Sequence, residues 1–278
     1  VDGGGNTGGL FGSGDSLAIT NTATGTTIVS AASTPDSGSI QTPDTANTTS
    51  FVGIEIVLLA ASASTDDLLI SGTDADDTIT ISNNFATVND RAVVSFSSFD
   101  ELTVVAFEGN DTITVNATTL AGVTGILVDG DFLGGNTGQD SVHVAGSGGA
   151  DVIGFAPTSS TDAAVTIAGV TTTVVRSESV LIDGLEGNDT LTVTTPAGVT
   201  TTSLTPGSTV DSGDVQVASL IPLSFENLGT TGSLVINDAD ATADDTLVYR
   251  GTGSDDTFAV SGNGIVTLNS QIDVDVLG

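Results

Sequence analysis

The sequence repeats one phrase three times: DDLLISGTDADDTITI at Asp66–Ile81, QDSVHVAGSGGADVIGF at Gln139–Phe155 and DDTLVYRGTGSDDTFAV at Asp244–Val260. Each copy has an acidic start, a short apolar alternation, a turn with Gly and Asp, and a second apolar alternation. Alternation with period two is typical of a half-buried strand, and Gly with Asp is typical of a tight turn. Each phrase therefore predicts a strand, a turn and a strand, and its recurrence predicts a stacked repeat protein.

The repeat unit varies in length, because the three phrases are unequally spaced when Asp67, Asp140 and Asp245 are taken as equivalent positions. We expect one continuous array, cut from a longer chain, because both ends of the sequence interrupt repeat text. The predicted units are residues 1–70, 71–146, 147–250 and, in part, 251–278. Residues 21–50 are rich in Thr and Ser and break the rhythm, so they predict an irregular surface insertion.

A second motif, E-G-N-D-T followed by an apolar alternation, occurs at Glu108–Val115 and Glu186–Val193. No stretch of the sequence has a sustained helical period, so we expect an all-β protein without α-helix. The spacing of the first two phrases is shorter than the roughly 100 residues of an immunoglobulin-like domain, and the core has no Trp or Tyr, so a right-handed parallel β-solenoid or β-helix is favoured. The alternative is a tandem array of immunoglobulin-like β-sandwiches.

Composition restricts the possible partners. The chain has 35 acidic and three basic residues, a formal net charge of -32, and no Cys. Nucleic acid and anionic membrane surfaces are poor partners for such a surface, and no apolar run is long enough to insert into a membrane. Disulfides and thiolate metal sites are excluded. Most of the acids are Asp, which favours turns and short-range cation coordination over acidic helices.

The Gly-Asp turns GTDADDTITI, EGNDTITV, EGNDTLTV and GTGSDDTFAV resemble the repeats of hemolysin-type (RTX) calcium-binding proteins. The match covers short, separate stretches without tandem nonapeptides. The resemblance implies a parallel β-roll with calcium between successive turns, and it carries over to Asp77, Asp111, Asp151, Asp189 and Asp256. The whole chain is also similar in composition to large Asp-, Gly- and Thr-rich repetitive surface proteins of bacteria.

Calcium prefers oxygen ligands, so the acids and amides of these turns are the candidate metal ligands. They are Asp74, Asp76, Asp77, Asn110, Asp111, Asp140, Asp151, Asn188, Asp189, Asp244, Asp245, Asp255 and Asp256. Two alternatives stay open. The Asp residues could cap their turns by binding backbone amides without a metal, and the acidity could be an adaptation to high salt.

Catalysis has few candidate residues. The single His, His143, lies in an alternating stretch, and Arg91, Arg176 and Arg250 share no motif. We therefore expect no enzyme, with a carbohydrate-active β-helix enzyme as the less favoured alternative.

We expect an extracellular structural repeat protein, stabilised by calcium, that forms or supports a cell-surface layer or filament. Its partners would be copies of itself or neighbouring repeats, and the alternative is an adhesin stalk that does not assemble. Glycans could modify Asn47 or the Thr/Ser-rich residues 21–50. The sequons at Asn110 and Asn188 lie in tight turns, where a structural Asn is expected.

Overall fold

Strands dominate the described chain. The computed structural model describes residues 1, 15–44, 48–62, 65–132, 138–240 and 245–277. Within them, the only helical element is a short 3-10 turn, η1 (Ala117–Thr119), so the prediction of an all-β fold is confirmed. The chain divides into unit 1 (Val1–Asp140) and unit 2 (Ser141–Gly278).

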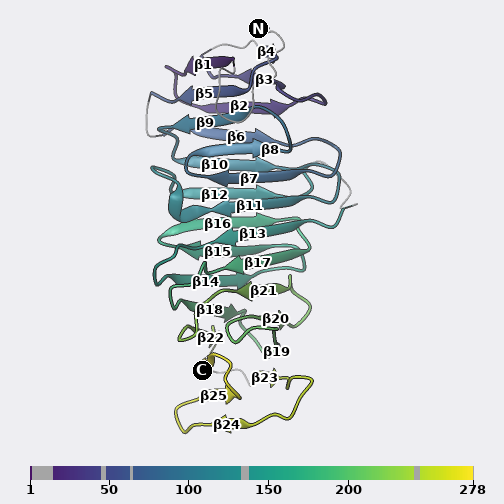
Figure 1. Cartoon of the computed structure of the whole chain (residues 1–278), viewed down its shortest axis with the longest axis vertical. Coiled ribbons are helices and arrows are strands. Elements are labelled where there is room, and N and C mark those ends of the chain that lie inside the picture. The colour runs from purple at the N-terminus through teal and green to yellow at the C-terminus, as the bar shows by residue number, and fades with distance from the viewer. Residues whose placement is uncertain (2–14, 45–47, 63–64, 133–137, 241–244, 278) are drawn as a thin grey trace. The chain divides into compact units, whose positions relative to one another are not determined.

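Unit 1 contains two sheets, whose strands lie one above another in Figure 1. The strand order of sheet I is β1 (Ser16–Thr20), β5 (Ile56–Ala60), β9 (Val93–Ser97), β8 (Phe85–Val88), β7 (Thr78–Ser82), β11 (Thr112–Asn116). The strand order of sheet II is β4 (Thr48–Val52), β3 (Ser37–Gln41), β2 (Thr26–Ala31), β6 (Asp67–Ser71), β10 (Glu101–Val105), β12 (Gly125–Asp129).

Unit 2 also contains two sheets. The strand order of sheet III is β13 (Ser141–Ala145), β17 (Ser179–Asp183), β21 (Leu223–Glu226), β20 (Gly213–Val217), β19 (Thr201–Pro206), β23 (Thr246–Tyr249). The strand order of sheet IV is β16 (Val170–Val175), β15 (Ala163–Ile167), β14 (Val152–Pro157), β18 (Thr190–Thr195), β22 (Ser233–Asp238), β26 (Asp273–Leu277), β25 (Ile265–Leu268), β24 (Phe258–Val260).

The chain winds through each unit as a β-solenoid. It passes from one sheet to the other after each single strand or after a three-stranded antiparallel meander, such as β7–β8–β9 or β14–β15–β16. Strands of successive coils pair in parallel, as in β6–β10–β12 and β14–β18–β22–β26. Immunoglobulin-like sandwiches are built from antiparallel sheets, so these parallel ladders favour the solenoid over that alternative.

The core of each unit is made of inward-facing aliphatic residues that stack from coil to coil. In unit 1, Ile79 of β7 pairs in register with Ile113 of β11, and Ile81 pairs with Val115. All four side chains are completely buried, whereas the alternate Thr residues of these strands face outward. The period-two alternation in the sequence therefore predicts the inward and outward faces correctly.

The repeated phrases form the corners where the chain changes sheets. The first copy leads from β6 in sheet II to β7 in sheet I, and the third leads from β23 in sheet III to β24 in sheet IV. Asp66, rather than Asp67, is the counterpart of Asp140 and Asp245, so the predicted equivalence is wrong by one residue. Asp66 directly precedes its strand and accepts the N–H of Gly25 at 3.1 Å. Asp67 is the first residue of the strand itself.

The prediction of an irregular insertion at residues 21–50 is also wrong. This segment contains β2, β3 and most of β4, which form an antiparallel meander. An antiparallel strand with one buried face needs few apolar residues, and Val29, Ile40 and Phe51 supply them here. The aromatic ring of Phe51 packs against Gly38, where an added Cβ would lie 2.8 Å from Cζ. Asn47 lies outside the described residues.

Candidate functional site: the aspartate corners

Buried aspartates connect successive coils at the corners of unit 1. The N–H of Asp77 donates to Oδ1 of Asp111 at 2.7 Å, and the N–H of Asp111 donates to Oδ1 of Asp140 at 2.8 Å. The N–H of Thr112 also donates to the carbonyl of Asp77 at 2.9 Å. The three aspartates are at most 2% exposed. They form an aspartate ladder, in which the carboxylate of one aspartate accepts the backbone N–H of the aspartate in the preceding coil.

Unit 2 contains the same arrangement. The N–H of Asp151 donates to Oδ1 of Asp189 at 2.8 Å, and the N–H of Thr190 donates to the carbonyl of Asp151 at 2.9 Å. At another corner, Asp245 accepts the N–H of Thr200 at 2.7 Å, and this bond leads the causes that lower its pKa. The ladder is therefore a recurring device in which carboxylates bind backbone amides, as in the alternative that needs no metal.

A second hydrogen-bonded row runs beside the ladder of unit 1. The N–H of Asn110 donates to Oδ1 of Asp76 at 2.8 Å, and the N–H of Gln139 donates to Oδ1 of Asn110 at 3.0 Å. In unit 2, Asn188 accepts the N–H of Thr231 at 3.0 Å. The side chains of Asn110 and Asn188 thus have structural hydrogen bonds in the turns where the sequence places sequons.

Three of the corner aspartates are clasped by a hydroxyl residue four positions earlier. Thr73 donates its N–H and Oγ1–H to Oδ2 of Asp77 at 2.6 and 3.0 Å. Ser147 donates to Asp151 in the same way, at 2.6 and 3.0 Å. Thr252 also clasps Asp256, and its side-chain hydrogen bond is the leading cause that lowers the pKa of this carboxyl.

A glycine precedes each hydroxyl residue, because the carboxylate occupies the space of its side chain. A Cβ at Gly72, Gly146 or Gly251 would lie 2.6, 2.8 or 2.2 Å from a carboxylate oxygen of the clasped aspartate. The clasped corner therefore has the pattern G-[ST]-x-x-x-D. This pattern is visible in the sequence, and it separates the clasped corners from the others.

The two E-G-N-D corners lack this clasp. The positions that correspond to Thr73 and Ser147 are Phe107 and Leu185, whose backbones are left-handed at φ values of 72° and 58°. Neither side chain has a hydroxyl group. Within the described residues, Oδ2 of Asp111 and Oδ2 of Asp189 are buried and have no hydrogen-bond partner. We call Asp111 and Asp189 the unclasped aspartates.

The missing clasp affects the pKa values of the unclasped aspartates. Burial raises the pKa of Asp111 to about 7, and the nearby carboxylates of Asp140, Asp77 and Asp76 add to the rise, whereas the hydrogen bond from Asp77 opposes it. Burial is also the leading cause that raises the pKa of Asp189. An unpartnered buried carboxylate destabilises the fold when it is charged. These two corners would therefore gain most from a proton or a cation.

The other predicted metal ligands have different surroundings. Asp74, Asp76 and Asp255 are exposed, and Asp244 lies outside the described residues. Sequence reasoning missed Asp131, which is 2% exposed and has two buried carboxylate oxygens without a partner in the described chain. In the part of the chain that the structure describes, no group of three or more His, Cys, Asp or Glu side chains is arranged to hold a metal ion.

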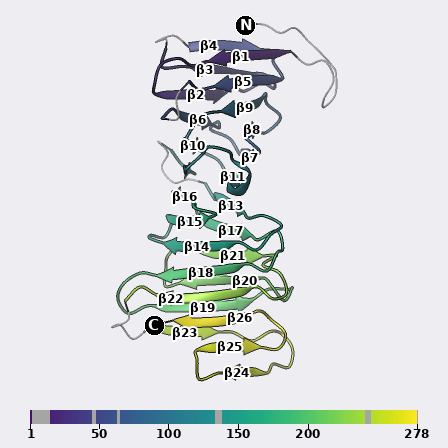
Figure 2. The same cartoon turned by 90° about the vertical axis from the view of Figure 1, so that its left-hand side faces the viewer.

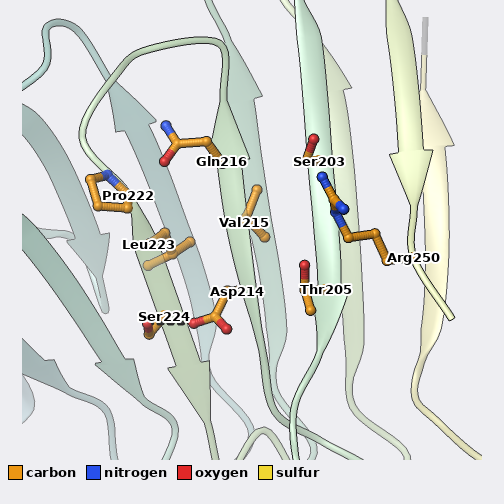
Figure 3. Close-up of a pocket in the computed structure, with 9 residues that line it drawn as sticks. All are labelled: Ser203, Thr205, Asp214, Val215, Gln216, Pro222, Leu223, Ser224 and Arg250. Carbon is orange, nitrogen blue, oxygen red and sulfur yellow. Dashed lines mark hydrogen bonds between the residues drawn. The ribbon is translucent and has the colours of Figure 1, made fainter. Parts of the chain in front are cut away.

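A shallow trough of about 570 Å³ lies over the outer face of β19, β20 and β21 in unit 2 (Figure 3). Its polar side chains bind their neighbours: Ser224 donates to Asp214 at 2.7 Å, and Gln216 donates to the carbonyl of Leu220 at 2.6 Å. Arg250 lies at one side of the trough. His143 is half-buried on β13, outside the trough, and burial lowers its pKa.

Comparisons with protein families, with curated proteins and with solved structures find no match to this chain. No helix among the described residues has the length and apolar character needed to cross a membrane.

Proposed function

We propose that this chain is a structural β-solenoid of an extracellular surface layer or filament, and that calcium stabilises it at the unclasped aspartates. The hydrogen bonds that the corner side chains make support the proposal. Their carboxylates and amides bind the backbone of the next coil, so they hold the stack together along its length. A repeat fold of this kind gains its stability from such nearest-neighbour contacts.

One observation carries the calcium part of the proposal: Oδ2 of Asp111 and Oδ2 of Asp189 are buried and have no partner among the residues that the structure describes. An anionic oxygen in this position is suited to a hard cation, which prefers oxygen ligands. The clasped aspartates fit a cation less well, because Thr73, Ser147 and Thr252 already donate to their carboxylates. Asp111 and Asp189 are therefore the residues that would hold calcium, and the bound ion would supply positive charge and ligand bonds at these corners.

The net charge gives a second reason for cation binding. A formal charge of -32 destabilises the compact state by self-repulsion, and Asp76, Asp77 and Asp140 lie close enough to raise the pKa of Asp111. A ligand that binds only the folded state stabilises that state by mass action. Extracellular modules bind calcium with dissociation constants of about 0.1–1 mM, so weak sites would be filled in that compartment.

Thermal unfolding in millimolar calcium and in chelator tests the calcium part. We expect a higher midpoint in calcium and a smaller gain with magnesium, which demands a more regular octahedral site. Equal midpoints in calcium and chelator would refute it. Electron microscopy of the same samples tests assembly. Ordered layers or filaments would support the layer or filament, whereas monomers at all concentrations would support the stalk.

A further inference from the structure

Sheet I of unit 1 differs from the other three sheets in charge. None of its six described strands contains a charged residue, although the chain has a formal net charge of -32. The described strands of sheets II, III and IV contain three acidic residues in each sheet. The outer face of sheet I is therefore a neutral surface on a strongly acidic protein.

An apolar patch lies on this outer face. Ile56 and Leu58 of β5 point outward and are 39% and 42% exposed, and Phe85 of β8 is 45% exposed. Val93 pairs with Ile56, and Ser95 pairs with both Leu58 and Phe85, so the patch is continuous across β5, β9 and β8. We call Ile56, Leu58, Phe85 and Val93 the sheet I patch. Covering these side chains would remove apolar surface from water, which favours association.

Hydroxyl residues surround the sheet I patch. On β7 and β11, Thr78 pairs in register with Thr112, and Thr80 pairs with Thr114. Their outward side chains offer methyl and hydroxyl groups but no charge. The strands of sheet I lie one after another along unit 1 (Figure 2). A further coil of the same stack would pair with an edge strand of the sheet, so the outer face stays open whatever precedes or follows this chain.

We propose that the outer face of sheet I is a self-association surface, against which the same face of a second copy packs. This inference rests on the proposed structural function, because it names the contact through which neighbouring copies in a layer or filament meet. Two β-sheets pack face to face about 10 Å apart, with their side chains interdigitated. A two-fold axis between the faces places the sheet I patch of each copy against the patch of the other.

Charge identifies a second copy as the occupant of this face. Two chains that each carry a net charge of -32 repel one another, and contacts through sheets II, III or IV would bring exposed acids together, such as Glu101, Asp214 or Asp273. Contact through sheet I brings no carboxylate of its strands close to another. A basic protein would bind the acidic sheets in preference, because this face offers it no carboxylate.

The size of the face sets the expected strength of the contact. Six strands about 4.8 Å apart, each of about five residues at about 3.3 Å per residue, give a footprint of about 500 Å² per copy, or about 1,000 Å² in all. This area is at the lower limit for a specific contact between proteins. We therefore expect a weak dimer in solution, and a stronger association in an array where many such contacts act together.

Sedimentation equilibrium in millimolar calcium tests the surface. We expect the wild-type chain to dimerise, and to do so more strongly at high salt, because salt screens the repulsion between the two copies. Leu58→Asp/Phe85→Asp should raise the dissociation constant by about tenfold or more, since it places carboxylates on both facing patches. Val152→Asp is the control and should leave the constant unchanged, because Val152 is 76% exposed on β14 of sheet IV, outside the patch. Circular dichroism must show that all variants are folded.

Mixing two single variants separates a lost contact from a damaged fold. Leu58→Lys and Leu58→Asp should each dimerise poorly alone, because like charges then meet across the two-fold axis. Their equimolar mixture should associate about as well as the wild-type chain, because opposite charges then meet. A mixture that stays monomeric would overturn the face-to-face contact.

Electron microscopy of the same variants separates this inference from the proposed function. Wild-type layers or filaments that survive Leu58→Asp/Phe85→Asp would refute the surface and leave the layer or filament standing. Wild-type dimers that the double variant abolishes, without any ordered assembly, would support the surface and refute the layer or filament. A wild-type chain that stays monomeric at high concentration and high salt would refute the surface.

Discussion

Substitution of Asp by Asn should have opposite effects on stability at two neighbouring residues of the aspartate ladder, Asp111 and Asp77. Asp111→Asn removes the charge of a carboxylate whose Oδ2 has no partner in the described part of the chain, and it keeps an oxygen to accept the N–H of Asp77. Asp77→Asn replaces a carboxylate that already accepts two hydrogen bonds from Thr73 and one from Asn89. At pH 8 in chelator, we therefore expect Asp111→Asn to stabilise unit 1 and Asp77→Asn to destabilise it.

The magnitudes follow from these contacts. Asp111→Asn leaves a polar amide in the same position but removes the buried charge that raises the pKa of Asp111 to about 7. One pKa unit corresponds to about 1.4 kcal/mol, so after a discount for solvent screening the substitution should gain about 2 kcal/mol in the free energy of unfolding at pH 8. Hydrogen bonds to charged groups contribute about 1.5–3 kcal/mol each, so Asp77→Asn should lose about 3 kcal/mol. For a domain of this size, the corresponding shifts of the unfolding midpoint are about +6 and −10 °C.

Differential scanning calorimetry in chelator is the assay, and unit 2 supplies an independent pair. Asp189→Asn corresponds to Asp111→Asn, and Asp151→Asn corresponds to Asp77→Asn, because Ser147 clasps Asp151. The reasoning is refuted if Asp111→Asn and Asp189→Asn lower the midpoint as much as the substitutions of the clasped aspartates do.

Three further predictions use the same corners. Ala106→Gly/Phe107→Thr builds the pattern of the clasped corners before Asp111, and it should raise the midpoint in chelator and reduce the gain from calcium, as calorimetry would show. Gly184→Ala should lower the free energy of unfolding by about 2 kcal/mol or more, because its Cβ would lie 2.2 Å from Oδ2 of Asp189. The control is Gly148→Ala, whose Cβ would have its nearest contact at 4.0 Å and which should change this free energy by less than about 0.5 kcal/mol. Urea unfolding measures both. Because the pKa of Asp111 is about 7 in the folded chain and about 3.9 when unfolded, the free energy of unfolding in chelator should fall as pH rises from about 4 to 7; a pH series that gives the same slope for wild type and Asp111→Asn would contradict this.

The sequence predicts the repeated strand–turn–strand corners well, because alternation and turn residues act locally. The Thr-Ile-Thr-Ile of β7 and the Thr-Ile-Thr-Val of β11 are recognisable without knowledge of their partners. The meander β2–β3–β4 is harder to recognise. Each of its strands buries few apolar residues among Ser and Thr, and its pairing depends on contacts such as Phe51 against Gly38.

The candidate site could be predicted in part. The Gly-Asp turns identify the corner aspartates, but the pattern alone does not show which carboxylates are satisfied. That depends on the hydroxyl of Thr73 or Ser147, and on the left-handed backbones at Phe107 and Leu185. The ladder depends on coil-to-coil register, which brings residues that are far apart in the sequence into contact. Asp131 was missed because it lies outside the Gly-x-Asp pattern.

Isothermal titration with calcium tests the central claim most directly, because it counts the sites. We predict two corner sites in the wild-type chain at pH 8, one of which is lost in Asp111→Asn, the other in Asp189→Asn and both in the double variant. Asp77→Asn and Asp151→Asn should keep both sites, provided that circular dichroism shows a folded chain. Undiminished calcium binding by the Asp111→Asn/Asp189→Asn variant, or no binding by the wild-type chain, would contradict the assignment of the cation to the unclasped aspartates.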